Sequence, residues 1–113
     1  MKRMILLIIL TLIFTAGCNQ KSPDTKSFAQ CLTGQGIKMY GASWCYHCKQ
    51  QKAMFGQDWV LINYIECANP ENAEKCKKAG IEAYPTWYIN ASTRVKGKLS
   101  FQKLSKLTGC KFE

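Results

Sequence analysis

The sequence predicts one α/β domain in which helices cover both faces of a mixed central sheet of about four strands. Strand-like and helix-like apolar patterns alternate along the chain, an order that is typical of this class. The length of 113 residues leaves room for one modest core. Apolar residues make up 47% of the chain and charged residues 20%, which excludes a disordered protein.

In the first half, apolar residues recur at helical spacing over 27–32 and two glycines follow them, which predicts a short helix. Residues 37–40 predict a strand. The next helix is expected to begin at the pair Cys45 and Cys48 and to run to Phe55. The cysteine pair is therefore expected at a helix N-terminus.

In the second half, β-branched and aromatic residues predict strands, and glycines end the helices. Leu104 and Leu107 share the apolar face of the last helix with Phe101, and Gly109 ends it. The expected elements are a strand over 59–65, a helix over 71–79, strands over 86–89 and 98–101 joined by a hairpin loop over 90–97, and this final helix.

The chain begins like an export signal. Basic residues precede an apolar stretch over 4–14, which is shorter than the about 20 residues that a membrane-spanning helix needs. The run TAGC at 15–18 then resembles a bacterial lipobox, in which the cysteine is linked to diacylglycerol, although Thr15 replaces the usual aliphatic residue. Residues 1–17 are thus expected to be a lipoprotein signal peptide.

This resemblance implies a lipidated Cys18 and a polar tether over 18–26, which leaves 27–113 as the folded domain. The protein is then expected in the cell envelope, lipid-anchored to a membrane and facing the periplasm or the cell exterior. Lipidation of Cys18 leaves six of the seven cysteines, an even number that can pair. The alternatives are a cleaved signal with an ordinary thiol at Cys18, or a short uncleaved anchor.

The net charge and the cysteine content indicate which kinds of partner and which compartment to expect. The net charge of +9 falls to +7 once Lys2 and Arg3 leave with the signal. The basic residues are scattered, so we expect a solvated lysine-rich surface and no nucleic-acid partner. Seven cysteines in so short a chain indicate an oxidising compartment.

The run Trp44-Cys45-Tyr46-His47-Cys48 is expected to carry the chemistry, because its spacing lets both sulfurs meet within one helical turn. A helix N-terminus stabilises the first thiolate, so Cys45 is predicted to be the nucleophile and Cys48 the resolving thiol. His47 is predicted to stabilise the reduced thiolate; the alternative is an exposed histidine with little effect. Trp44 is predicted to shield the pair and dock substrates, or else to pack in the core.

The run Tyr84-Pro85-Thr86 opens a predicted strand. It resembles the segment of thioredoxin-superfamily proteins in which a cis-proline and its neighbouring backbone dock the incoming peptide beside the reactive disulfide. Tyr84, Pro85 and Thr86 are therefore expected to form a substrate-docking edge. The alternative is a trans-proline that only begins a strand.

Most of the chain after the signal resembles the thioredoxin-like domains that are fused to bacterial homologues of vitamin K epoxide reductase. The segments that carry this resemblance are 28–32, 38–42, 44–48, 64–67 and 84–87. It implies a thioredoxin-like domain over 27–113 and thiol-disulfide oxidoreductase activity, with no cofactor expected. The implied partners are exported proteins with thiols or disulfides, and a membrane redox partner such as a vitamin K epoxide reductase homologue.

Two positions depart from the family pattern. Tyr46 stands where many relatives carry proline. Met39 stands where thioredoxin has a buried aspartate that accepts a proton. The resemblance therefore leaves the direction of electron flow open.

The other cysteines are expected to be structural. Cys67 and Cys76 flank a turn and are predicted to form a local disulfide. Cys31 and Cys110 either join the terminal helices through a further disulfide or remain a small buried hydrophobe and a free thiol. The second alternative is favoured, because the thioredoxin-like fold tends to place these helices on different faces.

Three functions are compatible with these features. The first is a membrane-tethered extracytoplasmic thiol-disulfide oxidoreductase that acts on protein disulfides. The second is Cu(I) binding by Cys45, His47 and Cys48, for delivery to an exported enzyme. The third is a structural lipoprotein whose cysteines are permanently bridged. The spacing of the cysteine pair and the docking edge favour the first.

Overall fold

A computed structural model of the chain describes residues 24–112. Its sheet has the strand order β2-β1-β3-β4. The first pair, β1 and β2, is parallel, whereas β3 runs antiparallel to both β1 and β4. The strands are β1 (Lys38–Gly41), β2 (Tyr64–Glu66), β3 (Thr86–Asn90) and β4 (Thr93–Lys96). The predicted mixed sheet of about four strands is confirmed.

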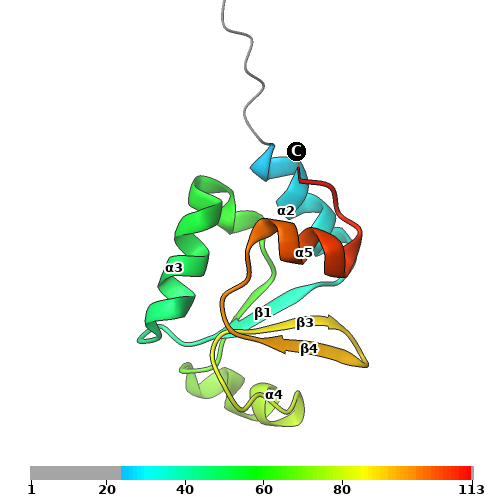
Figure 1. Cartoon of the computed structure of the whole chain (residues 1–113). Coiled ribbons are helices and arrows are strands. Elements are labelled where there is room, and N and C mark those ends of the chain that lie inside the picture. Colours follow the sequence, from blue (N-terminus) through cyan, green and yellow to red (C-terminus); the bar gives the residue numbers. More distant parts are fainter. Residues whose placement is uncertain (1–23, 113) are drawn as a thin grey trace, which may run out of the picture.

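Helices cover both faces of this sheet (Figure 1). Three lie on one face, namely α2 (Thr25–Gly34), α3 (Tyr46–Phe55) and α5 (Phe101–Thr108), and α4 (Ala73–Lys78) lies on the other. Because side chains alternate along a strand, Met39 of β1 joins the core under the three helices, whereas Tyr40 packs with Ile65 and Cys76 under α4. The architecture is that of a thioredoxin-like fold. Within residues 24–112, no helix is long and apolar enough to span a membrane.

The larger core is built around the ring of Phe28 in α2. Its centroid lies 6.4 Å from that of Phe55 in α3, and 5.3 Å from those of Phe101 in α5 and Phe112 beyond it. The two terminal helices therefore share one face, and the expectation that they lie on different faces is wrong. Burial of these rings is the main force that holds the three helices together.

A disulfide between Cys31 and Cys110 joins the same two helices, with the Cα atoms 5.8 Å apart. The favoured alternative, in which the two cysteines stay unpaired, is therefore wrong. The second disulfide, Cys67–Cys76, confirms its prediction and links the end of β2 to α4.

Polar caps decide where two helices begin. The Asp24 side chain accepts the N–H of Ser27 at 3.0 Å, so α2 starts at Thr25, two residues before the predicted start. The Ser100 hydroxyl accepts the N–H of Lys103 at 3.1 Å and begins α5. This cap corrects the strand predicted over 98–101, which is the approach to a helix.

The fourth strand lies inside the predicted hairpin loop, at Thr93–Lys96. The predicted strand over 59–65 is also corrected. Residues Gly56–Leu61 form a 3-10 helix, η1, and only Tyr64–Glu66 pairs with β1. The apolar residues of η1 are poorly buried: Trp59 is half-buried and Val60 is exposed. A strand that is buried on both faces would have covered both side chains. A second 3-10 segment, η2 (Pro70–Asn72), leads into α4.

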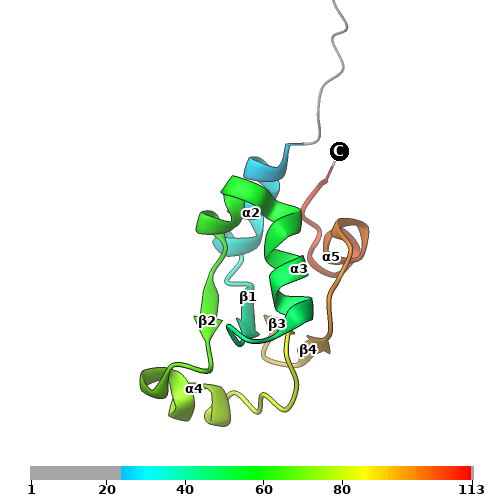
Figure 2. The same cartoon turned by 90° about the vertical axis from the view of Figure 1, so that its left-hand side faces the viewer.

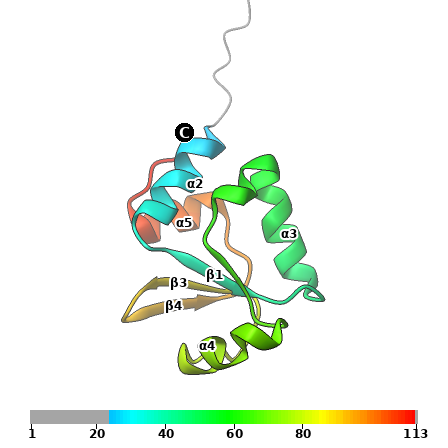
Figure 3. The same ribbon diagram turned by 180° about the vertical axis from the view of Figure 1, so that it is seen from behind.

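The described chain starts and ends at the same end of the molecule. The start of α2, the C-terminal residues and the end of α3 lie together, whereas the N-terminus of α3 lies away from them, toward α4 (Figures 2 and 3). Residues that begin α3 are therefore far from the point at which the preceding segment joins the domain.

Candidate active site

Cys45 and Cys48 are free thiols at the start of α3. Cys45 is the N-cap residue, and its sulfur accepts the N–H of Cys48 at 3.2 Å. Its own N–H donates to the carbonyl of Ala42 at 3.0 Å, which fixes the turn before the helix. Cys45 is 6% exposed and Cys48 is fully buried. This geometry places Cys45 at the entrance and Cys48 behind it, as expected for a nucleophile and a resolving thiol.

The electrostatic environment keeps Cys48 protonated at neutral pH. Burial raises the pKa of its thiol to about 12, and the hydrogen bond with Cys45 acts in the same direction. The backbone of Ala42 and the positive charge of Lys52 lower this pKa in part. Cys48 therefore needs help to become a thiolate.

Gln51 anchors α3 to the sheet. Its side chain is completely buried, its Nε2 donates to the Leu99 carbonyl at 3.0 Å, and its Oε1 accepts from Trp87 Nε1 at 3.1 Å and from the Leu99 N–H at 2.8 Å. These bonds link the active-site helix to β3 and to the segment before α5. The sequence pattern did not single out Gln51, because a glutamine in a helix is more often exposed.

The docking edge has the predicted backbone form, because the Tyr84–Pro85 peptide bond is cis. The Pro85 carbonyl accepts the N–H of Gly97 at 2.7 Å, which ties the loop to the segment after β4. Among residues 24–112, none forms a hydrogen bond with the backbone N–H or C=O of Tyr84. That backbone can therefore pair with an extended peptide.

Exposed aromatic rings lie at the start of α3. Trp44 is 70% exposed and Tyr46 is 68% exposed, which excludes core packing for Trp44. The Trp44 ring meets the Tyr84 ring edge-on, with the centroids 5.7 Å apart. This contact brings the two predicted docking segments together and gives the site an apolar rim.

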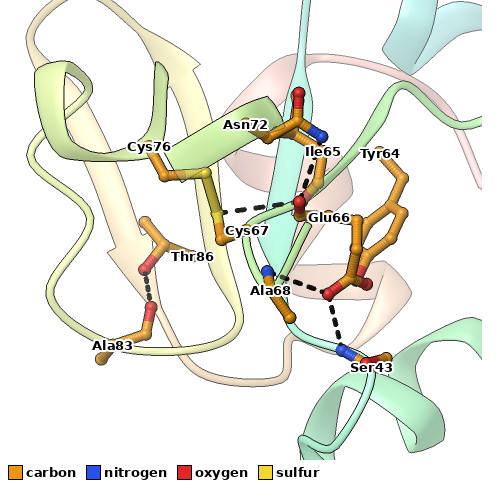
Figure 4. Close-up of a disulfide and its surroundings, with 10 residues drawn as sticks. All are labelled: Ser43, Tyr64, Ile65, Glu66, Cys67, Ala68, Asn72, Cys76, Ala83 and Thr86. Carbon is orange, nitrogen blue, oxygen red and sulfur yellow. Dashed lines mark hydrogen bonds between the residues drawn. A yellow bond between two sulfur atoms is a disulfide. The ribbon is translucent and has the colours of Figure 1, made fainter. Parts of the chain in front are cut away.

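Neither Thr86 nor His47 takes part in the contact between Trp44 and Tyr84. Thr86 is buried, and its hydroxyl donates to the carbonyl of Ala83 at 2.7 Å, so its side chain braces the loop (Figure 4). His47 is exposed, with Nδ1 3.3 Å from Oε1 of Gln50, which also accepts from Nζ of Lys98 at 3.3 Å. The contacts of His47 within the described part of the chain involve Tyr46 and Gln50 and neither active-site sulfur.

Glu66 ties the active-site loop to β2. Its carboxylate accepts the N–H of Ser43 at 2.8 Å and that of Ala68 at 3.1 Å (Figure 4). The hydroxyl of Tyr64 donates to its second oxygen. Burial alone would raise the pKa of Glu66, but these hydrogen bonds and the charge of Lys52 outweigh it and lower the pKa.

Tyr64 completes the wall behind the pair. Burial raises the pKa of its phenol, and the bond to Glu66 acts in the same direction, so the hydroxyl stays protonated. Sequence reasoning missed both residues. The alternation of Tyr64 and Glu66 along a strand places them on one side of it, which is the signal that could have found them.

Within residues 24–112, the His, Cys, Asp and Glu side chains form no group of three or more that could hold a metal ion. His47, the third ligand of the Cu(I) alternative, contacts Tyr46 and Gln50 and neither active-site sulfur, which does not favour that alternative. The free thiols of Cys45 and Cys48 likewise do not favour a protein with permanently bridged cysteines. Cys18 and the signal predicted over 1–17 lie outside the described residues.

The comparisons with known proteins point to the same chemistry. No protein-family model matches the chain. Over 99 residues it is 38% identical to thiol-disulfide oxidoreductase LTO1 of Arabidopsis thaliana, a match that takes in 80% of this chain. The match covers 26% of the plant protein, so the chain spans about a quarter of that relative's length. The similarity supports a thioredoxin-like redox domain and an oxidoreductase.

Proposed function

We propose that this chain is an extracytoplasmic thiol-disulfide oxidoreductase that exchanges disulfides with exported proteins through Cys45 and Cys48. The observation that carries the proposal is the position of Cys45 as the N-cap of α3, with Cys48 directly behind it and the cis-proline loop joined to it through Trp44 and Tyr84. The similarity to a thiol-disulfide oxidoreductase supports it.

The reduction of a substrate disulfide takes two exchanges. The Cys45 thiolate attacks one substrate sulfur, the substrate S–S bond breaks, and the other substrate sulfur leaves as a thiolate. Cys48 then attacks the Cys45 sulfur of this mixed disulfide and releases the first substrate sulfur. Two electrons have passed from the pair to the substrate, and the pair is left as a disulfide. The reverse sequence oxidises a substrate dithiol.

The substrate is an extended segment of an exported protein. Its backbone pairs with the free N–H and C=O of Tyr84, and its side chains near the reactive cysteine pack on Trp44 and Tyr46. An apolar rim with exposed aromatic rings suits unfolded or partly folded chains, which expose apolar residues and backbone together.

The proposal includes the membrane tether. Cys18 carries the lipid, residues 18–26 act as the spacer, and a membrane redox partner of the vitamin K epoxide reductase kind renews the pair. A chain with Cys18→Ala should leave the membrane fraction while it keeps its thiol exchange. Retention of this variant in the membrane fraction would contradict the tether and leave the exchange chemistry intact.

Titration of the purified chain in glutathione buffers tests the redox activity. We expect a reversible two-electron couple that is lost in Cys45→Ser and kept when Cys67 and Cys76 are replaced by alanine. A potential above about −150 mV indicates an oxidase, and one near about −270 mV indicates a reductant. No exchange at any glutathione ratio would overturn the proposal.

A further inference from the structure

We propose that Lys52 assists the resolving step by stabilising the Cys48 thiolate, and that Tyr64 and Glu66 hold its ammonium group in the required place. The inference rests on the proposed exchange function and adds a positioning residue to it. It explains how a fully buried thiol ionises in a site that has Met39 where an internal carboxylate is expected.

The need for such a group follows from the burial of Cys48. The thiolate is the attacking form, and burial disfavours it. Met39 is itself fully buried in the core and offers no polar atom other than a weakly accepting sulfur. The stabilising charge must therefore come from another element.

Lys52 follows Cys48 by one helical turn on α3, so both side chains lie on neighbouring parts of one helix face. Its ammonium nitrogen lies 4.1 Å from the centroid of the Tyr64 ring and 5.8 Å from that of Trp59. A cation above an aromatic face is held there by the ring's quadrupole. Lys52 is half-buried, so contacts with the protein restrict the position of its side chain.

Tyr64 is the common neighbour of Lys52 and Cys48. A Cβ atom placed on Gly41 would lie 3.0 Å from Sγ of Cys48, 2.9 Å from Cε2 of Tyr64 and 3.1 Å from its hydroxyl oxygen. The sulfur and the phenol therefore pack against the same backbone position. Glycine at position 41 permits this approach, because any larger residue would collide with both side chains.

Glu66 fixes the orientation of Tyr64. The carboxylate is held by the N–H groups of Ser43 and Ala68 and accepts the Tyr64 hydroxyl. The charged and titratable groups around Cys48 are thus Cys45 and Lys52 from α3 and its cap, and Tyr64 and Glu66 from β2. Of these four, Lys52 is the cation, and its charge lowers the pKa of Cys48 against the effect of burial.

The resolving step balances without a further reactant. The Cys48 thiol loses its proton to solvent, and its thiolate is stabilised by Lys52 as it attacks Sγ of Cys45. The new S–S bond joins Cys45 to Cys48, the bond between Cys45 and the substrate breaks, and the departing substrate sulfur takes up a proton. Lys52 stays protonated throughout and acts through its charge.

Rapid mixing of the reduced full chain with one equivalent of dithiobis(nitrobenzoate) separates the two exchanges. Attack by Cys45 releases the first coloured thiolate, and attack by Cys48 on the mixed disulfide releases the second; Cys48→Ser identifies the second phase by its loss. Lys52→Met is the test variant, Lys52→Arg restores a cation, and Lys49→Met removes the same charge from an exposed position of the same helix.

We expect Lys52→Met to slow the second release about threefold to tenfold at neutral pH, because less of the Cys48 thiol is ionised without the nearby positive charge. The slowing is limited, because a thiolate of higher pKa is a stronger nucleophile. The first release should keep its rate. Lys52→Arg and Lys49→Met should keep the wild-type second release, and added salt should bring the wild-type rate toward that of Lys52→Met. The inference would be overturned if Lys52→Met released the second thiolate at the wild-type rate, or if Lys49→Met slowed this release as much as Lys52→Met does. Failure of the proposed function would instead abolish the first release in the wild type.

Discussion

Two neighbouring glutamines in α3, Gln50 and Gln51, have different roles because they differ in burial. Gln50 is partly exposed, and its Oε1 lies 3.3 Å from both Nδ1 of His47 and Nζ of Lys98. Gln51 faces the core, where its amide satisfies three polar groups of Trp87 and Leu99. Gln51 therefore fixes the position of the helix that carries both cysteines, and it does so without contact with the substrate.

Replacement of Gln51 by leucine should lower the free energy of unfolding by about 3 kcal/mol, because the buried indole N–H and the backbone of Leu99 lose their partners. Urea denaturation followed by tryptophan fluorescence measures the change. Gln30→Leu is the matched control, since Gln30 is an exposed helical residue, and it should stay within about 0.5 kcal/mol of the wild type. Equal stability of Gln51→Leu and the wild type would show that water replaces the lost partners.

The chemical identity of the pair could be predicted from single residues, whereas its surroundings could not. Two cysteines at this spacing, together with Tyr84-Pro85-Thr86 at the start of a strand, favoured the exchange chemistry over metal binding. Tyr64 comes close to Cys48 only because β2 pairs with β1, and Glu66 acts on this site through its hydrogen bond with Tyr64. Nothing in the linear sequence states that the ammonium group of Lys52 lies over the ring of Tyr64, a residue of a different element.

At the scale of elements, α3, β1 and β3 were predictable because each combines a clear pattern with a sharp boundary. The start of α3 coincides with the cysteine pair, and Pro85 precedes β3. The hairpin strand β4 was missed because it has one apolar residue, Val95, among polar neighbours that face solvent. The strand predicted over 98–101 was wrong because the apolar Leu99 and Phe101 flank the helix cap Ser100.

The two disulfides should contribute unequally to stability. Cys31–Cys110 closes a loop with a sequence separation of 79, against 9 for Cys67–Cys76. Loop-closure entropy predicts losses of about 4 to 5 kcal/mol and about 2 to 3 kcal/mol, respectively, when each pair is replaced by alanine. Urea denaturation of the two double variants, with Cys45 and Cys48 intact, gives the order. A greater loss from the Cys67 and Cys76 pair would show that local strain or native contacts outweigh loop length.

At the scale of the whole molecule, the fold separates the start of α2 from the cysteine pair. The start of α2 lies at one end of the domain, and α3, which Cys45 caps, begins well away from it on the side of α4 (Figure 2). The disulfide between Cys31 and Cys110 and the cluster of rings around Phe28 stiffen the attachment end. If Cys18 carries the proposed lipid, we expect the apolar rim to face away from the membrane surface.

This orientation predicts that anchoring does not hinder exchange with soluble substrates. The lipidated chain on phospholipid vesicles and the free Cys18→Ala chain should react with a soluble peptide disulfide at equal rate constants, because exchange is far slower than diffusional encounter. Stopped-flow fluorescence of Trp44, which is exposed beside the reacting sulfur, follows both reactions. A markedly slower reaction on vesicles would show that the rim contacts the lipid surface. The distance between the start of α2 and the cysteine pair would then not keep the site accessible to soluble substrates.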